Sequence, residues 1–144
     1  MTTRKLLTTA CLTFFTISLL SAQSDIFGKW KSIDDKSGEA KSIIEIYKKG
    51  DKAFGKIVQL LQPDPDDPDP LCDKCKDYRK DKKIIGMNII TDMVVEGKEW
   101  VDGEILDPEN GKVYRCKLWI EDSTLKVRGY VGFIYRTQTW YQAD

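Results

Sequence analysis

The strongest constraint on the fold of this chain is that its apolar residues recur at every second position. The run IIGMNIITDMVV at residues 84–95 shows this alternation, and residues 40–46, 114–120 and 125–135 repeat it. Successive side chains of a β-strand point to opposite faces, so a period of two predicts strands with one buried face. No window has a convincing helical period. The side chains predicted to point inward are Ala40, Ser42, Ile44, Ile46, Ile85, Met87, Ile89, Thr91, Met93, Val95, Tyr114, Cys116, Leu118, Ile120, Leu125, Val127, Gly129, Val131, Phe133 and Tyr135.

Turn signals between the alternating runs divide the chain into strands. Short links such as DPENGK and EDST favour hairpins between consecutive strands. An open meander would leave two exposed edges, whereas a barrel removes them, and a sandwich would need longer crossings. The sequence therefore predicts an all-β fold, a single antiparallel up-and-down β-barrel of about eight strands. We place the strands near residues 27–33, 40–48, 52–61, 84–95, 98–106, 112–121, 124–135 and 138–142.

The N-terminus has the layout of a secretory signal peptide. Arg4 and Lys5 precede an apolar run over residues 6–20, and small residues follow. The run is shorter than the roughly 20 apolar residues that a membrane span needs. We expect residues 1–22 to be removed, with cleavage after residue 24 as the alternative, which leaves residues 23–144 as one domain. No membrane span is then expected, and the location would be periplasmic or extracellular.

Composition excludes several classes of function. The chain has 23 basic and 23 acidic residues, and removal of Arg4 and Lys5 leaves 21 basic residues and a net charge of −2. Neither nucleic acid nor an anionic membrane is therefore an expected partner. Because the chain contains 0 histidines, it cannot use a histidine base, a Ser-His-Asp triad or an imidazole zinc ligand. We expect no enzymatic activity, no cofactor and no metal site.

A long loop, QPDPDDPDPLCDKCKDYRKDKK at residues 62–83, contains two of the three cysteines outside the leader. In an oxidising compartment a disulfide is expected. We favour Cys72 with Cys75, while a bridge from either to Cys116 or a thiol-active centre remains open. A redox pair needs a helix N-terminus to lower the thiol pKa, and here prolines and aspartates precede the first cysteine. We interpret the loop as a stapled cap over one barrel mouth.

Several motifs together resemble a known family. Gly28-Lys29-Trp30 is similar to the Gly-x-Trp that opens the first strand of lipocalins, and the larger pattern resembles DUF2147, an uncharacterised family of small exported bacterial proteins. The resemblance implies a lipocalin-like or fatty-acid-binding-like barrel and structural roles for Gly28, Trp30, Arg136 and Trp140. Arg136, or second Arg128, would pack on Trp30 as a cation–π pair. The matching pieces are GKW at 28–30, GKI at 55–57, LCDKC at 71–75, IIGM at 84–87, GEILDPENGKVY at 103–114, LKVRGYVG at 125–132 and RTQTW at 136–140.

Two functions fit such a barrel. The first is a non-catalytic binder of a small apolar or amphipathic molecule, with Lys80, Lys82 and Lys83 of the loop placed to meet a fatty-acid carboxylate. The second is a filled barrel that acts through its surface as an interaction or structural module of the envelope. A thiol oxidoreductase is a third, less favoured alternative. A cavity of a few hundred cubic ångströms would favour the binder. Its predicted ligand-binding residues are Ile44, Ile46, Met87, Ile89, Met93, Leu118, Val127 and Phe133.

The leader prediction can be tested by mass. Protein recovered from the cell envelope should lack residues 1–22 or 1–24, because the three-part layout directs export and cleavage. Intact-mass spectrometry gives the cleavage site. Recovery of the full-length chain from the cytoplasm would contradict the expected compartment and, with it, the basis for expecting a disulfide.

Overall fold

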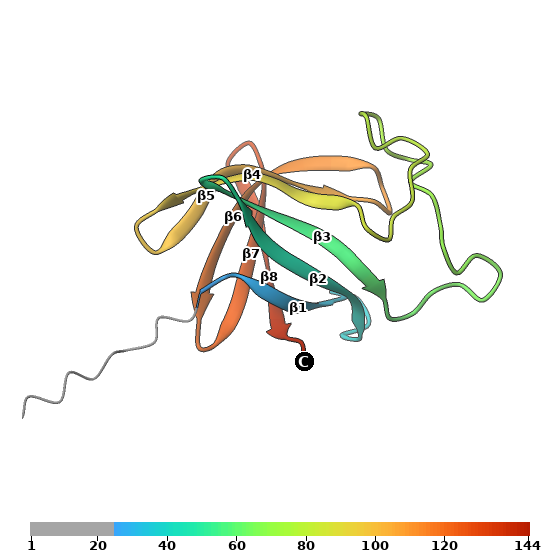
Figure 1. Cartoon of the computed structure of the whole chain (residues 1–144), viewed down its shortest axis with the longest axis horizontal. Coiled ribbons are helices and arrows are strands. Elements are labelled where there is room, and N and C mark those ends of the chain that lie inside the picture. The colour runs from blue at the N-terminus through green and yellow to red at the C-terminus, as the bar shows by residue number, and fades with distance from the viewer. Residues whose placement is uncertain (1–24) are drawn as a thin grey trace, which may run out of the picture.

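The computed structural model describes residues 25–144, which form one closed antiparallel barrel (Figure 1). Each strand pairs with the next along the chain, and the last strand returns to the first. No helix occurs in this part of the chain. The predicted fold class and strand number are therefore confirmed. The strands are β1 (Gly28–Ile33), β2 (Ala40–Lys49), β3 (Lys52–Leu60), β4 (Asn88–Glu96), β5 (Glu99–Asp107), β6 (Lys112–Glu121), β7 (Thr124–Val131) and β8 (Ile134–Gln142).

Turn residues explain why the strands break where they do. Asp122 and Ser123 adopt φ values of 50° and 60°, the positive values that a tight hairpin between twisted strands requires. At the β5–β6 turn the Gly111 amide donates to the Asp107 carbonyl oxygen at 2.8 Å. Since the strands alternate in direction, the turns after β2, β4 and β6 lie at one end of the barrel. The links after β1, β3, β5 and β7 lie at the other end, which we call the mouth.

The prediction placed the start of β4 four residues too early. Residues 84–87 form a turn instead, in which the Met87 amide donates to the Ile84 carbonyl oxygen at 3.1 Å and Gly86 has a φ of 91°. Ile85 consequently points outward and is 37% exposed, so its predicted inward orientation is wrong. Gly86 bends the chain without interrupting the alternation of apolar residues around it. The predicted strand therefore included a turn.

The predicted strand 124–135 is divided by a second unrecognised turn. Val131 pairs with Ile134, and Gly132 has a φ of 60°, which leaves Gly132 and Phe133 as a two-residue hairpin link. Phe133 lies at the tip with 93% of its surface exposed. Its predicted inward position is therefore wrong. Val131 and Tyr135, which were also predicted to point inward, are more than half exposed at the edge of the barrel.

Strands β4 and β5 carry facing irregularities. Asp92 and Asp102 have φ values of 59° and 61°, which few non-glycine residues adopt within strands. The register shifts on both outer sides of this pair, where β4 meets β3 and where β5 meets β6. Bulges of this kind increase local twist and bend the strand. Val95, predicted to point inward, pairs with the buried Trp100 but is 53% exposed, because it lies close to the β4–β5 turn at the end of the barrel.

Glycine is required where these two strands approach. A methyl group on Gly103 would overlap the Met93 sulfur and the Thr91 carbonyl oxygen, and would lie 2.9 Å from the Met93 amide nitrogen. Gly129 offers a contrast, since its methyl group would lie 3.5 Å from the Tyr114 Cβ atom, an ordinary contact. The backbone geometry of β4 and β5 thus depends on the absence of a side chain at Gly103.

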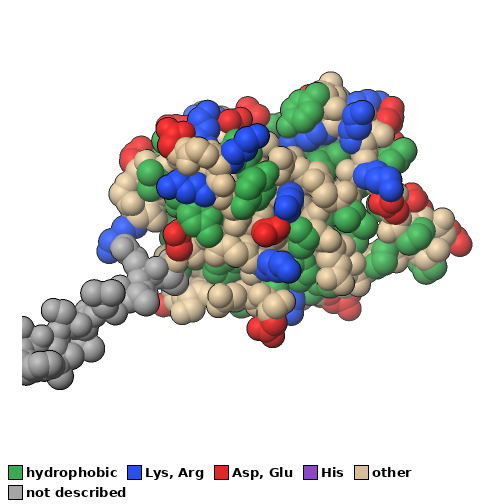
Figure 2. Space-filling view, viewed as in Figure 1, with side chains coloured by type: hydrophobic (Ala, Val, Ile, Leu, Met, Phe, Trp, Pro, Cys, Tyr) green, Lys and Arg blue, Asp and Glu red, His purple; other side chains and the backbone are tan. Residues whose placement is uncertain are grey.

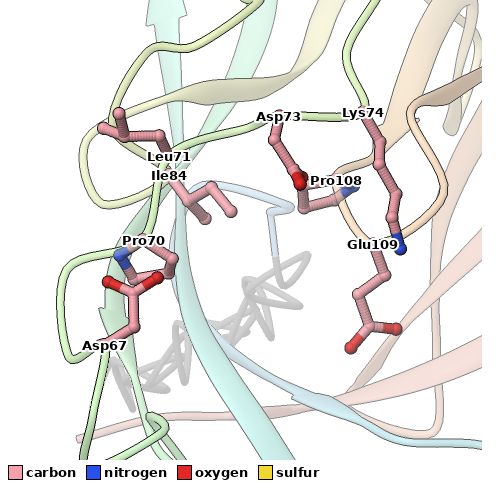
Figure 3. A pocket seen from close by; sticks show the side chains of 8 residues that line it. All are labelled: Asp67, Pro70, Leu71, Asp73, Lys74, Ile84, Pro108 and Glu109. Atoms are coloured by element: carbon pink, nitrogen blue, oxygen red, sulfur yellow. The ribbon is translucent and has the colours of Figure 1, made fainter.

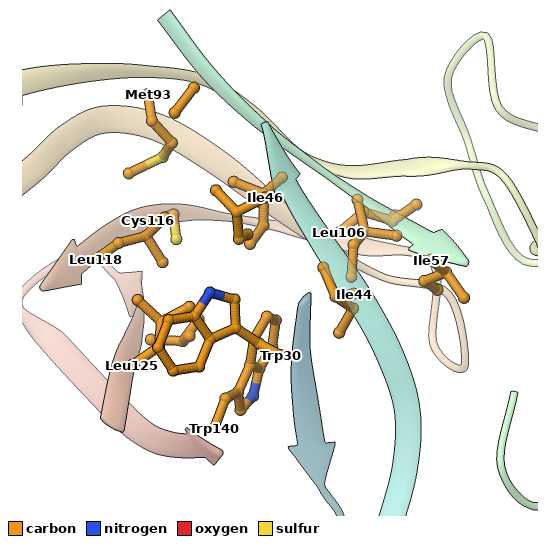
Figure 4. Close-up of a cluster of buried hydrophobic side chains, with 14 of the residues drawn as sticks. Trp30, Ile44, Ile46, Ile57, Met93, Leu106, Cys116, Leu118, Leu125 and Trp140 are labelled. Carbon is orange, nitrogen blue, oxygen red and sulfur yellow. The ribbon is translucent and has the colours of Figure 1, made fainter. Parts of the chain in front are cut away.

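The half of the barrel away from the mouth is filled by side chains (Figure 4). Trp30 and Trp140 belong to this buried cluster, together with aliphatic residues from the facing strands. The indole nitrogen of Trp30 donates to the Ile26 carbonyl oxygen at 2.7 Å, which ties the segment before β1 across this end. Across both halves of the barrel and the long loop, the largest fully buried side chains are Ile44, Ile46, Ile90, Met93, Leu106, Leu118, Leu125, Cys72 and Cys75.

The long β3–β4 loop is folded on itself and extends beyond the barrel at the mouth end (Figure 1). Cys72 and Cys75 form a disulfide, as predicted. The Cys72 amide donates to the Lys82 carbonyl oxygen at 2.8 Å, and Leu71 forms a β-bridge with Lys83. The loop therefore doubles back on itself: backbone hydrogen bonds join its two arms, and the disulfide closes a short turn between them.

The loop also docks on the β5–β6 turn. A methyl group on Gly111, whose φ is 71°, would overlap the Lys74 carbonyl oxygen, so the two backbones are in direct contact. Cys72 Sγ lies 3.8 Å from the Pro108 carbonyl oxygen on the same turn. Figure 3 shows Asp73 and Lys74 facing Pro108 and Glu109 across a groove of about 450 Å³. The docked loop therefore borders the barrel mouth.

A buried arginine fixes the return arm of this loop. Arg79 is 5% exposed, and its guanidinium donates to the Asp77 carboxylate at 2.6 Å and to the Asn88 carbonyl oxygen at 3.0 Å. The hydrogen bond from Arg79 lowers the pKa of Asp77 below its usual value. Because Asn88 is the first residue of β4, this contact joins the loop to the barrel wall.

The outer surface carries both charges. On the face shown in Figure 2, Lys and Arg side chains are interspersed with Asp and Glu side chains. Surface ion pairs include Lys56 with Glu45 at 3.2 Å and Lys52 with Asp92 at 3.2 Å. Exposed pairs of this kind contribute little to stability individually. Among the described residues, no helix has the length and apolarity that crossing a membrane would require.

The tight approach at Gly103 gives a stability prediction. Gly103→Ala should lower the free energy of unfolding by about 1–3 kcal/mol or more, because the methyl group must displace the β4 backbone. Gly129→Ala is the matched control and should change it by no more than about 0.5 kcal/mol. Urea denaturation followed by tryptophan fluorescence measures both. Equal stability of the two variants would contradict the close approach.

Candidate functional site

The barrel contains a cavity in the half nearest the mouth. It has a volume of about 970 Å³ and extends from the interior wall to the loops that surround the opening. Ligand pockets commonly have volumes of about 300–1,000 Å³. The interior is thus neither wholly open nor wholly filled, since a packed half adjoins a hollow one.

The deep wall of the cavity is apolar. Each of the eight strands contributes side chains to the cavity lining. Such a wall favours hydrocarbon over water because burial of apolar surface is favourable. The apolar and aromatic lining consists of Ile33, Ile44, Ile57, Leu60, Ile84, Ile89, Ile105, Leu106, Tyr114, Val127, Val131, Ile134, Tyr135 and Trp140.

One hydroxyl pair interrupts this wall. Ser32 and Ser42 are 6% and 5% exposed, and their Oγ atoms lie 2.7 Å apart. Ser32 Oγ also donates to the Ser42 carbonyl oxygen at 3.3 Å, so Ser42 is the donor to Ser32. Both hydroxyl protons are then used, and lone pairs of the two oxygens are left to accept a hydrogen bond. The pair supplies a small polar point in an otherwise hydrocarbon surface.

The rim of the cavity is acidic. Two of its cations are engaged, Lys41 with Glu109 at 2.6 Å and Arg136 with Asp35. Hydrogen bonds from the Ser37 and Lys36 backbone amides lower the pKa of Asp34, which stays ionised at neutral pH. Negative charge therefore predominates where a ligand would enter. The charged lining residues are Asp34, Asp35, Asp64, Asp67, Asp107 and Glu109 against Lys36, Lys41 and Arg136.

The barrel wall is incomplete beside the cavity. Strand β8 pairs with β1 only at Gln142 and Tyr141, opposite Trp30 and Lys31. Tyr135, Arg136 and Gln138 of β8 border the cavity and have no β1 partner. Strand β1 ends at Ile33, so the two strands diverge toward the mouth.

A polar latch spans this gap. Asp35, in the β1–β2 link, accepts hydrogen bonds from Gln138 Nε2 at 2.5 Å and from Arg136. Gln138 Oε1 accepts in turn from the Trp140 indole nitrogen at 3.0 Å. The β1–β2 link is thereby held against β8 by side chains where the backbone ladder is missing.

The predicted ligand-binding residues fall into separate groups. Ile44, Ile89 and Val127 line the cavity. Ile46, Met93 and Leu118 belong instead to the packed half. Period two correctly identified inward positions, but it could not tell which level of the barrel is hollow.

Met87 and Phe133 lie elsewhere. Met87 is buried in the core cluster, and its carbonyl oxygen accepts from the Ile57 amide at 3.0 Å. It does not appear in the cavity wall. Phe133 is at the exposed β7–β8 turn described above. Neither of the two methionines predicted to bind ligand, Met87 and Met93, therefore lines the cavity.

The predicted pairing of Arg136 with Trp30 is wrong. Arg136 is at the mouth, bonded to Asp35, whereas Trp30 is 3% exposed in the packed half. The second candidate, Arg128, stacks instead on Tyr135 and Trp119, at 4.1 and 4.8 Å from the ring centroids. Gly28, with a φ of 120°, begins β1, and Trp140 is buried in the same cluster as Trp30. Trp30 closes the barrel floor without an arginine.

The thiol chemistry of the chain is deeply buried. Cys72 and Cys75 are 0% and 2% exposed in their disulfide. Cys116 is the remaining cysteine of the described residues, and burial raises its pKa to about 12. A thiol in this environment stays protonated at neutral pH and is a poor nucleophile. Within residues 25–144, no group of three or more Cys, Asp or Glu side chains is arranged to hold a metal ion.

Some lining residues were missed. Extending the alternation from Trp30 to Ser32, and from Trp140 back to Gln138, would have found two of them. The rim carboxylates lie in loops, where no period applies. Lys80, Lys82 and Lys83 were expected at the mouth, but they do not line the cavity, and Lys83 pairs with Asp69 at 2.6 Å.

Comparison with known proteins agrees with this geometry. A solved structure similar to this chain is that of protein HP1028 from the human pathogen Helicobacter pylori, described as belonging to the lipocalin family. The two are 13% identical, the match covers 83% of this chain and 84% of that chain, and the TM-score is 0.71. At this identity the likeness shows the fold alone.

Searches of curated proteins find no match. The family model described as an uncharacterized protein conserved in bacteria, DUF2147, matches residues 28–142. That range runs from the first residue of β1 to the last residue of β8, so it includes the whole barrel and its loops. The chain therefore belongs to the DUF2147 family, and its fold is a lipocalin-like barrel of eight strands.

Proposed function

We propose that this protein is an exported, non-catalytic carrier or sensor that binds one small apolar or amphipathic molecule. The observation that carries the proposal is the cavity of about 970 Å³, which has hydrocarbon side chains on its deep wall and falls within the range of about 300–1,000 Å³ common for ligand pockets. A barrel built only as a structural module would gain stability from filling that space, since empty apolar volume is destabilising. The signal-like leader, which lies outside the described residues, supports a periplasmic or extracellular location.

The rim indicates which ligands are favoured. Six carboxylates and three cations line the cavity, and two of those cations are already paired with rim carboxylates. An anionic headgroup would therefore meet net repulsion at the opening. Lys80, Lys82 and Lys83, which were predicted to meet a fatty-acid carboxylate, do not line the cavity. We therefore propose a neutral or cationic amphiphile, whose tail lies along Ile44, Ile89 and Val127.

The chain's own residues account for orientation within the cavity. The Ser32–Ser42 hydroxyl pair accepts a hydrogen bond from a ligand donor in the interior, and Asp34 and Asp64 at the rim favour a positive or hydrogen-bond-donating headgroup. Catalysis is not part of the proposal. The buried disulfide and the high-pKa Cys116 thiol give no accessible thiolate for redox chemistry.

Ligand displacement tests the proposal. A neutral fluorescent naphthylamine should bind the mature protein, and dodecylamine should displace it more effectively than dodecanoate at low salt, because the rim is acidic. Native mass spectrometry of envelope-purified protein should show a bound small molecule. Failure of every probe to bind would contradict the carrier, whereas equal displacement by the amine and the acid would contradict only the charge preference.

A matched pair of variants locates the site. Val127→Phe places a larger side chain in the cavity and should weaken probe binding by about tenfold, because its ring occupies space in which the probe would bury apolar surface. Val113→Phe adds the same group on the outside of β6, where Val113 is 40% exposed, and should leave binding unchanged. Circular dichroism checks that both variants fold. Equal binding by the two variants would place the probe outside the barrel.

A further inference from the structure

The β7–β8 hairpin ends in an exposed apolar tip. Val131, Phe133, Ile134 and Tyr135 are 63%, 93%, 69% and 56% exposed, and they are contiguous in space because Val131 pairs with Ile134 and Tyr130 with Tyr135. Isolated exposed apolar residues are ordinary, but a contiguous cluster marks a surface that meets another apolar phase. The chain places it beside the cavity, whose lining includes Val131, Ile134 and Tyr135.

Behind the tip, the outer face of β6–β8 is basic and aromatic. Arg128 lies between two rings, 4.1 Å from the Tyr135 centroid and 4.8 Å from the Trp119 centroid. Arg115 lies 5.8 Å from the Tyr130 centroid and donates to the Gly132 carbonyl oxygen at 3.4 Å. These two guanidinium groups contact rings and backbone, so their charge is not neutralised by a carboxylate there.

The other charges around the tip are largely balanced. Arg136 pairs with Asp35, Lys117 with Glu99 at 2.8 Å, and Lys126 lies 3.9 Å from Glu121. Glu104 is opposite Arg115 on β5. On the neighbouring β5–β6 turn, Glu109 is paired with Lys41, and Asp107 accepts hydrogen bonds from Asn110 and from the Glu109 amide. Arg115 and Arg128 form no ion pair in the described chain, but Glu104 is the cross-strand neighbour of Arg115, so the face behind the tip carries only a small positive excess.

We propose that this tip and the face behind it dock on an anionic lipid surface. Aliphatic and phenylalanine side chains at the end would enter the acyl boundary, tyrosine and tryptophan rings would lie at the headgroup level, and the arginines would meet lipid phosphates. Because the rim carboxylates Asp64 and Asp67 would be repelled by such a surface, the barrel would dock on the β7–β8 side rather than mouth-first. The proposal does not depend on the identity of any cavity ligand.

Vesicle flotation tests the proposal with mature protein. Vesicles of phosphatidylglycerol and phosphatidylethanolamine should bind the protein about tenfold more strongly than phosphatidylcholine vesicles, and added salt should weaken the binding because it screens the arginines. Phe133→Ser combined with Ile134→Ser should reduce binding about tenfold, since both side chains are surface-exposed and would lose their apolar contact with lipid.

The control is Val94→Ser combined with Val95→Ser, two exposed apolar residues in β4 near the β4–β5 turn at the other end of the barrel. This variant should bind vesicles like the unaltered protein. Absence of binding to anionic vesicles, or equal binding by the tip variant, would overturn the proposal. So would a lipid-free dimer, seen by sedimentation velocity, that the tip substitutions abolish, because the tip would then be covered by a second copy.

Discussion

Closure of the barrel rests on a short seam between its first and last strands. Two residue pairs join β1 to β8, and the Ala143 amide adds a hydrogen bond to the Lys29 carbonyl oxygen at 2.9 Å. The seam coincides with the half that Trp30 and Trp140 fill. Toward the mouth, β1 and β8 no longer pair, side chains no longer fill the interior, and the cavity begins. The division into a packed and a hollow half therefore follows from where β1 stops.

Two tertiary contacts define the hollow half once the ladder has ended. Asp35 holds the β1–β2 link against β8, and the stapled loop docks on the β5–β6 turn at Gly111. Both contacts join segments distant in sequence and border the opening. The carboxylates of the rim are thus brought together by docking, and their combined charge is a property of the assembled mouth that no single segment possesses.

Period two and turn residues were sufficient to predict the barrel, because each hairpin is a local event. They failed where backbone conformation changes without a change in residue pattern. The apolar alternation continues across Gly132, where the chain turns, so Phe133 was placed on the wrong side. For the site, alternation found Ile44, Ile89 and Val127, but the rim lies in loops. The expected Arg136–Trp30 pair failed because these residues lie at different levels of the barrel.

Burial of Cys116 also has a consequence for assembly. Residues 25–144 contain three cysteines, so one thiol is left over when the other two form a bridge. Cys72 and Cys75 are three residues apart, so little loop-closure entropy is lost when they meet. Cys116 belongs to β6 and becomes buried only as the neighbouring strands form around it. Its high pKa then leaves almost no thiolate to attack the finished bridge. Burial in the barrel wall thus prevents the unpaired Cys116 thiol from exchanging with the Cys72–Cys75 disulfide.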